Sequence, residues 1–139
     1  MVRALLLAAL LSLASAGGAA AQTDEIERIR GFISGKKFVL HSNRGGVYGR
    51  SEAGPLFCLD YPIRFSEDQI VMQCPGSRLV VARYTLAPAT GARVTLTIRN
   101  EDQEKLLLAS IDRSNKFVLR EFASEINQQV REWTYVQSE

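Results

Sequence analysis

The chain has 139 residues, of which 46% are hydrophobic and 23% are charged. This length leaves room for one compact domain once any targeting segment is removed, which excludes a two-domain enzyme. A composition near the globular average, with only four prolines, excludes a disordered or fibrous chain. The formal net charge is only +2 and the arginines are spread along the sequence, so the concentrated basic surface of a nucleic-acid-binding protein is missing.

The first 21 residues have the pattern of a secretory signal peptide. Arg3 supplies one positive charge, an apolar run extends from Ala4 to Ala14, and small residues precede Gln22. The apolar run is shorter than the about 20 residues that a membrane-spanning helix needs. We therefore expect residues 1–21 to be cleaved and residues 22–139 to form one domain in the periplasm or outside the cell, with no permanent membrane anchor. An uncleaved N-terminal anchor is the alternative, which the well-formed cleavage site argues against.

Near the start of the mature chain, apolar residues recur at helical spacing. Ile26, Ile29 and Ile33 lie among charged residues. This pattern predicts a short amphipathic helix from residue 24 to residue 32, which Gly35 ends.

The middle of the sequence changes to the period of two that is typical of strands. In the clearest case, Val94, Leu96 and Ile98 alternate with polar residues, so one face of the strand is expected to be buried and the other to face water. Residues that favour turns separate eight such runs. The predicted strands are residues 36–42, 46–52, 55–65, 69–74, 78–86, 92–99, 104–111 and 116–122.

The connections between these strands are too short for helical crossovers, so neighbouring strands must be antiparallel. A meander of eight strands with one apolar face buries that face, and loses its unpaired edges, by closing into a barrel. The sequence therefore predicts a mainly β protein, a small antiparallel eight-strand meander barrel. Short strands also imply a narrow barrel that interior side chains can fill.

The last segment returns to helical spacing. Phe122, Ile126, Val130 and Trp133 lie four, four and three residues apart. This stripe predicts an amphipathic C-terminal helix, with Trp133 buried against the barrel. Val118 continues the stripe, which leaves open an alternative in which the helix replaces the eighth predicted strand.

The order of these elements is a short N-terminal helix, eight meandering strands and a C-terminal helix, which resembles the lipocalin-type small barrels in outline. In those proteins a Gly-x-Trp signature marks the first strand. This chain has Gly35-Lys36-Lys37-Phe38 there, and its one tryptophan is Trp133. The resemblance implies the barrel architecture, and no ligand or residue role is carried over from it.

Cys58 and Cys74 are the only cysteines. In a chain exported to an oxidising compartment they are expected to form a disulfide bond. The alternative is a redox pair, which depends on Cys-x-x-Cys spacing, whereas fifteen residues lie between these two thiols. A simple hairpin turning at residues 67–68 places Cys74 opposite Tyr61 and leaves Cys58 too distant for a direct bridge. We therefore expect either a bulge near Tyr61 or a Cys74 that lies beyond the end of its strand.

The sequence contains no catalytic or cofactor-binding signature. The only histidine, His41, lies in a predicted strand without a Gly-x-Ser-x-Gly motif elsewhere, so it is expected on the surface rather than as a general base. The acidic pairs Glu67-Asp68 and Glu101-Asp102 lie in predicted turns, where water solvates them. Zinc sites need clustered cysteine and histidine. We therefore expect no enzyme activity, no metal and no cofactor.

Two groups of residues have the composition of interaction surfaces. Arg44, Tyr48 and Arg50 flank a glycine-rich turn, and Tyr61 and Arg64 form a second group. Tyrosine and arginine are common at the centres of protein interfaces, and loops carry many of these centres. The alternative for the first group is a glycine-rich hairpin turn with a bulge and no binding role.

These features favour a non-enzymatic secreted or periplasmic protein that binds another secreted or envelope protein through loops at the barrel ends. An inhibitor of a secreted hydrolase is a specific form of this hypothesis. The alternative is a carrier of a small apolar ligand, which requires an open cavity inside the barrel.

Overall fold

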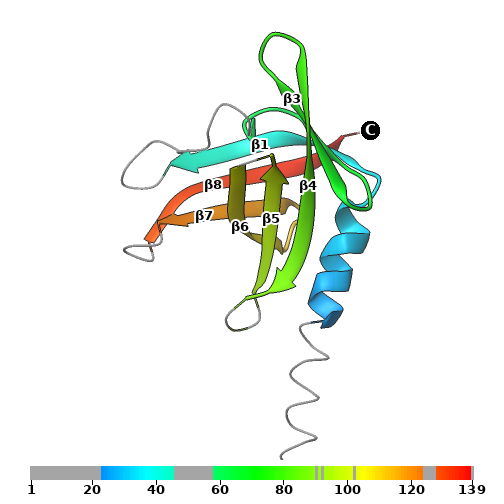
Figure 1. The fold of residues 1–139 in the computed structure, drawn as a ribbon. Coiled ribbons are helices and arrows are strands. Elements are labelled where there is room, and N and C mark those ends of the chain that lie inside the picture. Colours follow the sequence, from blue (N-terminus) through cyan, green and yellow to red (C-terminus); the bar gives the residue numbers. More distant parts are fainter. Residues whose placement is uncertain are drawn as a thin grey trace, which may run out of the picture.

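The computed structural model describes residues 23–45, 58–89, 91, 93–101, 103–123 and 128–138. Residues 23–33 form the N-terminal helix. The strands are β1 (Lys37–Gly45), β2 (Ile63–Phe65), β3 (Gln69–Cys74), β4 (Arg78–Pro88), β5 (Val94–Asn100), β6 (Gln103–Ile111), β7 (Phe117–Ala123) and β8 (Gln128–Ser138). They form a closed antiparallel barrel in chain order (Figure 1). The predicted mainly β meander barrel is therefore confirmed.

Alternate side chains along the strands point into the barrel and fill it, as expected. Val94, Leu96 and Ile98 are buried. Aromatic rings fill the barrel near the end where β1 begins, and there the ring centroid of Phe117 lies 5.7 Å from those of Phe38 and Phe65. The Tyr135 ring lies 6.3 Å from the Phe117 ring. Such edge-on and tilted ring pairs stabilise a core beyond the area that they bury.

The N-terminal helix packs at the end of the barrel where β1 begins, here called the helix end (Figure 1). Ile29 and Ile33 are fully buried and belong to the same core as the barrel residues. Gly35 follows the helix with a φ of 72°, a conformation that glycine adopts without strain, so the chain turns there into β1. The predicted short amphipathic helix is confirmed.

The predicted C-terminal helix is wrong, because residues Gln128–Ser138 form strand β8. β8 pairs with β7 on one side and with β1 on the other, and so closes the barrel. Trp133 and Tyr135, two positions apart, are at most 1% exposed, and Thr134 between them is 9% exposed. The expected burial of Trp133 is confirmed at 1% exposure, since both patterns place this residue inside. Ile126 and the side chains of Phe122 and Val130 lie outside the described residues.

The other predicted strands differ from the structure in one region. The predicted strand 46–52 lies outside the described residues, as do residues 55–57. Of the described part of the predicted strand 55–65, residues 58–65, only residues 63–65 form a strand, β2. The predicted strand 116–122 corresponds to β7, so the alternative that begins a helix there is wrong. The predicted signal peptide also lies outside the described residues, and within them no helix is long and apolar enough to cross a membrane.

Candidate functional site

A short segment before β2, residues 58–62, here called the disulfide loop, is fastened to the neighbouring strands. Cys58 is bonded to Cys74, the last residue of β3, with a Cα–Cα distance of 5.3 Å, so the expected disulfide is confirmed. Neither expected solution of the register problem is found, since Cys74 remains in β3, paired with Arg78. Instead the backbone N–H of Tyr61 donates to the carbonyl of Cys58 at 3.3 Å. This turn brings Cys58 back towards the end of β3.

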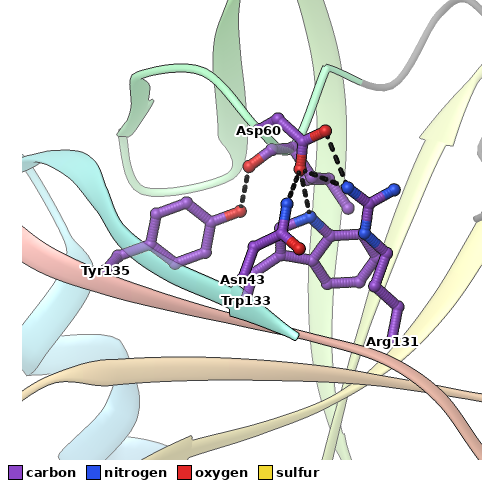
Figure 2. A network of polar contacts seen from close by, with 6 residues as sticks. Asn43, Asp60, Arg131, Trp133 and Tyr135 are labelled. Carbon is purple, nitrogen blue, oxygen red and sulfur yellow. Dashed lines mark hydrogen bonds and ion pairs between the residues drawn. The ribbon is translucent and has the colours of Figure 1, made fainter. Parts of the chain in front are cut away.

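Asp60, in the middle of the disulfide loop, accepts hydrogen bonds from three side chains at the other end of the barrel, here called the loop end (Figure 2). The Asn43 Nδ2 and Trp133 Nε1 atoms donate to Asp60 Oδ1, each at 2.9 Å. Arg131 Nη2 donates to both carboxylate oxygens at 2.9 and 2.8 Å. These four residues are here called the Asp60 network. Because charge-assisted hydrogen bonds are stronger than neutral ones, the network holds the loop over β1 and β8.

A bulge in β1 places Asn43 in this network. The pairing with β8 shifts from Leu40↔Tyr135 to Ser42↔Thr134, which leaves His41 as an extra residue in β1. A strand's side chains alternate between its two faces, so one extra residue moves all later side chains to the other face. Asn43 then lies opposite Trp133 and shares its inward face. The side chain of His41 is exposed, as expected.

Beneath the network, the Tyr135 hydroxyl donates to the carbonyl of Leu59 at 2.6 Å. Tyr135 is fully buried, and Leu59 is 2% exposed. Burial raises the pKa of Tyr135 well above its usual value, the negative charge of Asp60 raises it further, and Arg131 acts in the opposite direction. The phenol therefore stays protonated near neutral pH and remains a hydrogen-bond donor to the loop.

The ion pair in the network is partly solvated. The Asp60 side chain is 41% exposed and that of Arg131 is 20% exposed. The Arg131 guanidinium also lies over the Trp133 ring, 5.2 Å from its centroid, in a cation–π contact. Among its described members the network contains no nucleophile paired with a base. Its geometry is that of a clamp that fixes a loop.

A second ion pair lies near the same end of the barrel. Lys105 on β6 and Glu121 on β7 are paired, with side chains only 11% and 13% exposed. By alternation, Lys105 shares the inward face of Leu107, and Glu121 shares that of Leu119. Gln103 lies on the same face of β6, and its buried Oε1 atom has no hydrogen-bond partner among the described residues. The described interior thus changes from aromatic at the helix end to polar towards the loop end.

The predicted interaction residues fall in different places. Tyr61 lies in the disulfide loop and is 43% exposed, and Arg64 is exposed on β2. Arg44 is exposed on β1, opposite Glu132 of β8. Tyr48 and Arg50 lie outside the described residues. The structure thus places Tyr61, but not a complete predicted group, beside the Asp60 network.

The sequence reasoning missed Asp60, Asn43 and Arg131. Asp60 falls within the predicted strand 55–65, whereas in the structure the turn over residues 58–61 directs its side chain towards β8. The one available signal was an acidic residue two positions after a cysteine, within a largely apolar run.

No protein-family model, curated protein or solved structure matches the chain. The resemblance to the lipocalin-type barrels is not confirmed. Within the described part of the chain, no group of three or more histidine, cysteine, aspartate or glutamate side chains is placed to hold a metal ion.

Proposed function

We propose that this chain is a non-enzymatic binding protein of the periplasm or the extracellular space, which binds another secreted or envelope protein through the disulfide loop. The observation that carries this proposal is an exposed aromatic side chain, Tyr61, in a loop that is fixed on both sides. Leu59 is buried and accepts a hydrogen bond from Tyr135, and Asp60 is held by its network. The carbonyl of Pro62 accepts a hydrogen bond from the Gln73 backbone N–H at 3.0 Å.

A loop that is ordered before binding loses little conformational entropy when the complex forms. Tyrosine combines a large apolar ring with a polar tip, and it is enriched among the residues that contribute most to protein interfaces. Tyr61 therefore presents a preorganised contact. The disulfide supports an export location, because disulfides persist in oxidising compartments.

An inhibitor of a secreted hydrolase is the specific form of this function that the loop favours. Such inhibitors form interfaces of standard size and change shape little when they bind. A carrier of an apolar ligand would instead need an internal cavity. The rings of Phe38, Phe65, Phe117 and Tyr135 fill the barrel towards the helix end, and Lys105, Glu121 and Gln103 make its interior polar towards the loop end, which argues against that alternative.

The proposal is tested with three immobilised baits incubated with an envelope extract. They are the mature protein, Tyr61→Ala and the control Leu106→Ala, which removes another exposed side chain, on β6. We expect a partner that the mature protein and the control retain and that Tyr61→Ala loses. With the purified partner, Tyr61→Ala should weaken binding at least about tenfold, or about 1.4 kcal/mol. Retention of the same proteins by all three baits would contradict the proposal.

A further inference from the structure

Two positive charges lie side by side on the outer face of the barrel next to the disulfide loop. Lys37 of β1 and Arg64 of β2 are direct cross-strand partners. Like charges placed opposite one another in an antiparallel pair destabilise it. Among the described residues, neither side chain has a carboxylate within salt-bridge distance. The pair is therefore an uncompensated positive site on this face.

Two arginines, Arg83 and Arg99, also face one another across β4 and β5, but other cross-strand neighbours on the barrel supply a counter-charge. Arg99 of β5 pairs with Glu104 of β6. Arg120 of β7 pairs with Glu132 of β8 at 2.8 Å. Lys37 and Arg64 differ from these arginines, because neither has an acidic partner among the described residues.

A groove of about 270 Å³ adjoins the two cations. Its lining includes Lys37, Pro62, Arg64, Val71 and Leu79, and it is here called the β1–β4 groove. Leu79 is 65% exposed, and beside it on β4 an outward-facing Val81 is 50% exposed. Exposed apolar side chains gathered beside polar ones are typical of interaction surfaces. Because Pro62 directly follows Tyr61, the groove continues the surface of the disulfide loop.

We propose that the β1–β4 groove binds an acidic segment of the partner protein. A carboxylate of the segment lies between Lys37 and Arg64, and a neighbouring apolar side chain packs against Val71 and Leu79. The carboxylate offsets the repulsion between the cations, and the guanidinium of Arg64 offers it two parallel donors. The inference rests on the proposed function and identifies the chemistry of the partner that the loop contacts.

The charge pattern favours a protein segment over an anionic membrane surface or a second copy of the chain. An anionic membrane surface is recognised by clusters of four to eight basic residues, whereas this groove has two. The acids on the outer faces of β6 and β8, Glu104 and Glu132, are already paired within the chain, so these strands of a second copy offer the groove no free carboxylate.

A second hollow on the barrel surface supplies a matched control. It is lined by Arg83 and Arg99, but also by Glu101, and Arg99 is paired with Glu104. The positive charges of this hollow are thus offset by Glu101 and Glu104. Loss of the Arg83 charge should therefore leave acidic ligands of the β1–β4 groove almost unaffected.

The test selects short random peptides, displayed on phage, against the mature protein. We expect enrichment of peptides that carry aspartate or glutamate next to leucine, isoleucine or phenylalanine. Synthetic copies should bind less tightly as salt increases, because salt screens exposed charges. The double variant Lys37→Gln/Arg64→Gln should weaken binding at least about tenfold. The control Arg83→Gln/Arg113→Gln removes the same charge, since Arg113 is an exposed residue of the turn between β6 and β7, and should weaken binding at most about twofold. Selection of peptides without acids, or equal loss in both variants, would overturn the proposal.

Folding does not confound this test, because removal of the like charges should keep or raise the melting temperature. If the double variant nevertheless unfolds, Leu79→Ala compared with Leu106→Ala gives the same readout from two exposed positions. The Leu79 variant should lose peptide binding, and the Leu106 variant should keep it.

Two further results separate the possible failures. The mature protein could bind phosphatidylglycerol vesicles but no peptide, and the double variant could lose that vesicle binding. This result would overturn the protein segment as the occupant and indicate a lipid surface instead. A partner that depends on Tyr61 but tolerates Lys37→Gln/Arg64→Gln would overturn this inference and leave the proposed function standing. A partner that is indifferent to Tyr61 would instead remove the proposed function itself.

Discussion

Asp60 shows how one carboxylate can fasten a loop to a barrel. Asn43, Arg131 and Trp133 all donate to it, so its loss leaves each of them without that acceptor. Asp60→Asn should lower the free energy of unfolding by about 1–3 kcal/mol, because Arg131 loses its counter-charge and the donors lose charge-assisted bonds. The side chain is 41% exposed, so water replaces part of the lost interaction and the lower half of this range is expected.

Urea unfolding measures this difference. Asp68→Asn is the control, since Asp68 is an exposed aspartate in the β2–β3 connection. Equal unfolding curves for the two variants would show that the Asp60 network contributes nothing to stability.

Tyr135 links stability to alkaline pH. Its folded-state pKa lies well above that of an unfolded tyrosine, mainly because it is buried. The stability that this group contributes is present below about pH 10, the unfolded pKa, and is lost as the pH rises towards the folded pKa. Tyr135→Phe should therefore show a smaller fall in melting temperature above about pH 10 than the wild type. The pKa of Tyr84 is also raised, mainly by burial, so part of the loss of stability at alkaline pH will remain in the variant.

Melting temperatures recorded between about pH 8 and pH 11 check this prediction. Tyr61→Phe, at an exposed position, serves as the control and should follow the wild-type curve. At neutral pH, Tyr135→Phe should cost about 1 kcal/mol, because the carbonyl of Leu59 loses its donor. An alkaline slope identical to that of the wild type would show that Tyr135 ionises as easily in the folded state as in the unfolded one.

The disulfide bond between Cys58 and Cys74 ties the disulfide loop covalently to the end of β3. Cys58→Ser/Cys74→Ser should lower the free energy of unfolding by about 2–4 kcal/mol, since the bond restricts the unfolded chain. The same variant should weaken partner binding, because the loop then loses entropy when it binds. Denaturant unfolding and a binding assay with the partner measure the two effects. A variant of unchanged stability would mean that the hydrogen bonds of Asp60 and Tyr135 hold the loop by themselves.

The strands that the sequence predicted best are those with clean alternation and clear turn residues. β5 is the clearest example, because Val94, Leu96 and Ile98 all point inwards. β8 was mistaken for a helix because Trp133 fits both patterns. It lies three residues after Val130, as in a helix, and two residues before Tyr135, as in a strand. Thr134, Tyr135 and Val136 are residues that favour strands, and β1 requires a partner on its second edge. Pairing between distant segments overrode the local pattern.

The candidate site could be predicted only in part for a related reason. Tyr61 and the pair of cysteines stand out by residue type. Asn43 and Arg131 reach Asp60 only because a one-residue bulge at His41 and the turn at Cys58 set the faces of the strands. A register change of one residue reverses every side chain that follows, and local composition does not reveal it.

At the scale of the whole molecule, the described barrel has two different ends. The N-terminal helix and the aromatic core lie towards the helix end, whereas ion pairs and the disulfide loop lie towards the loop end. Apolar packing among many partners provides a rigid base, and the polar end can present an ordered loop without exposing that core. This division supports the placement of the proposed binding surface on the loop end and its adjoining outer face.

β8 makes the barrel a single closed unit, because it pairs with both β7 and β1. Deletion of residues 132–139 removes the buried Trp133 and Tyr135 and leaves two strands without a partner. We expect this variant to lose cooperative thermal unfolding, because it loses two large core side chains and closure together. Deletion of residues 137–139 alone, which removes only the pairs with Lys37 and Phe38, should keep a cooperative transition. Circular dichroism at near- and far-ultraviolet wavelengths distinguishes the two, and a cooperative transition in the longer deletion would show that the remaining strands form a stable core without closure.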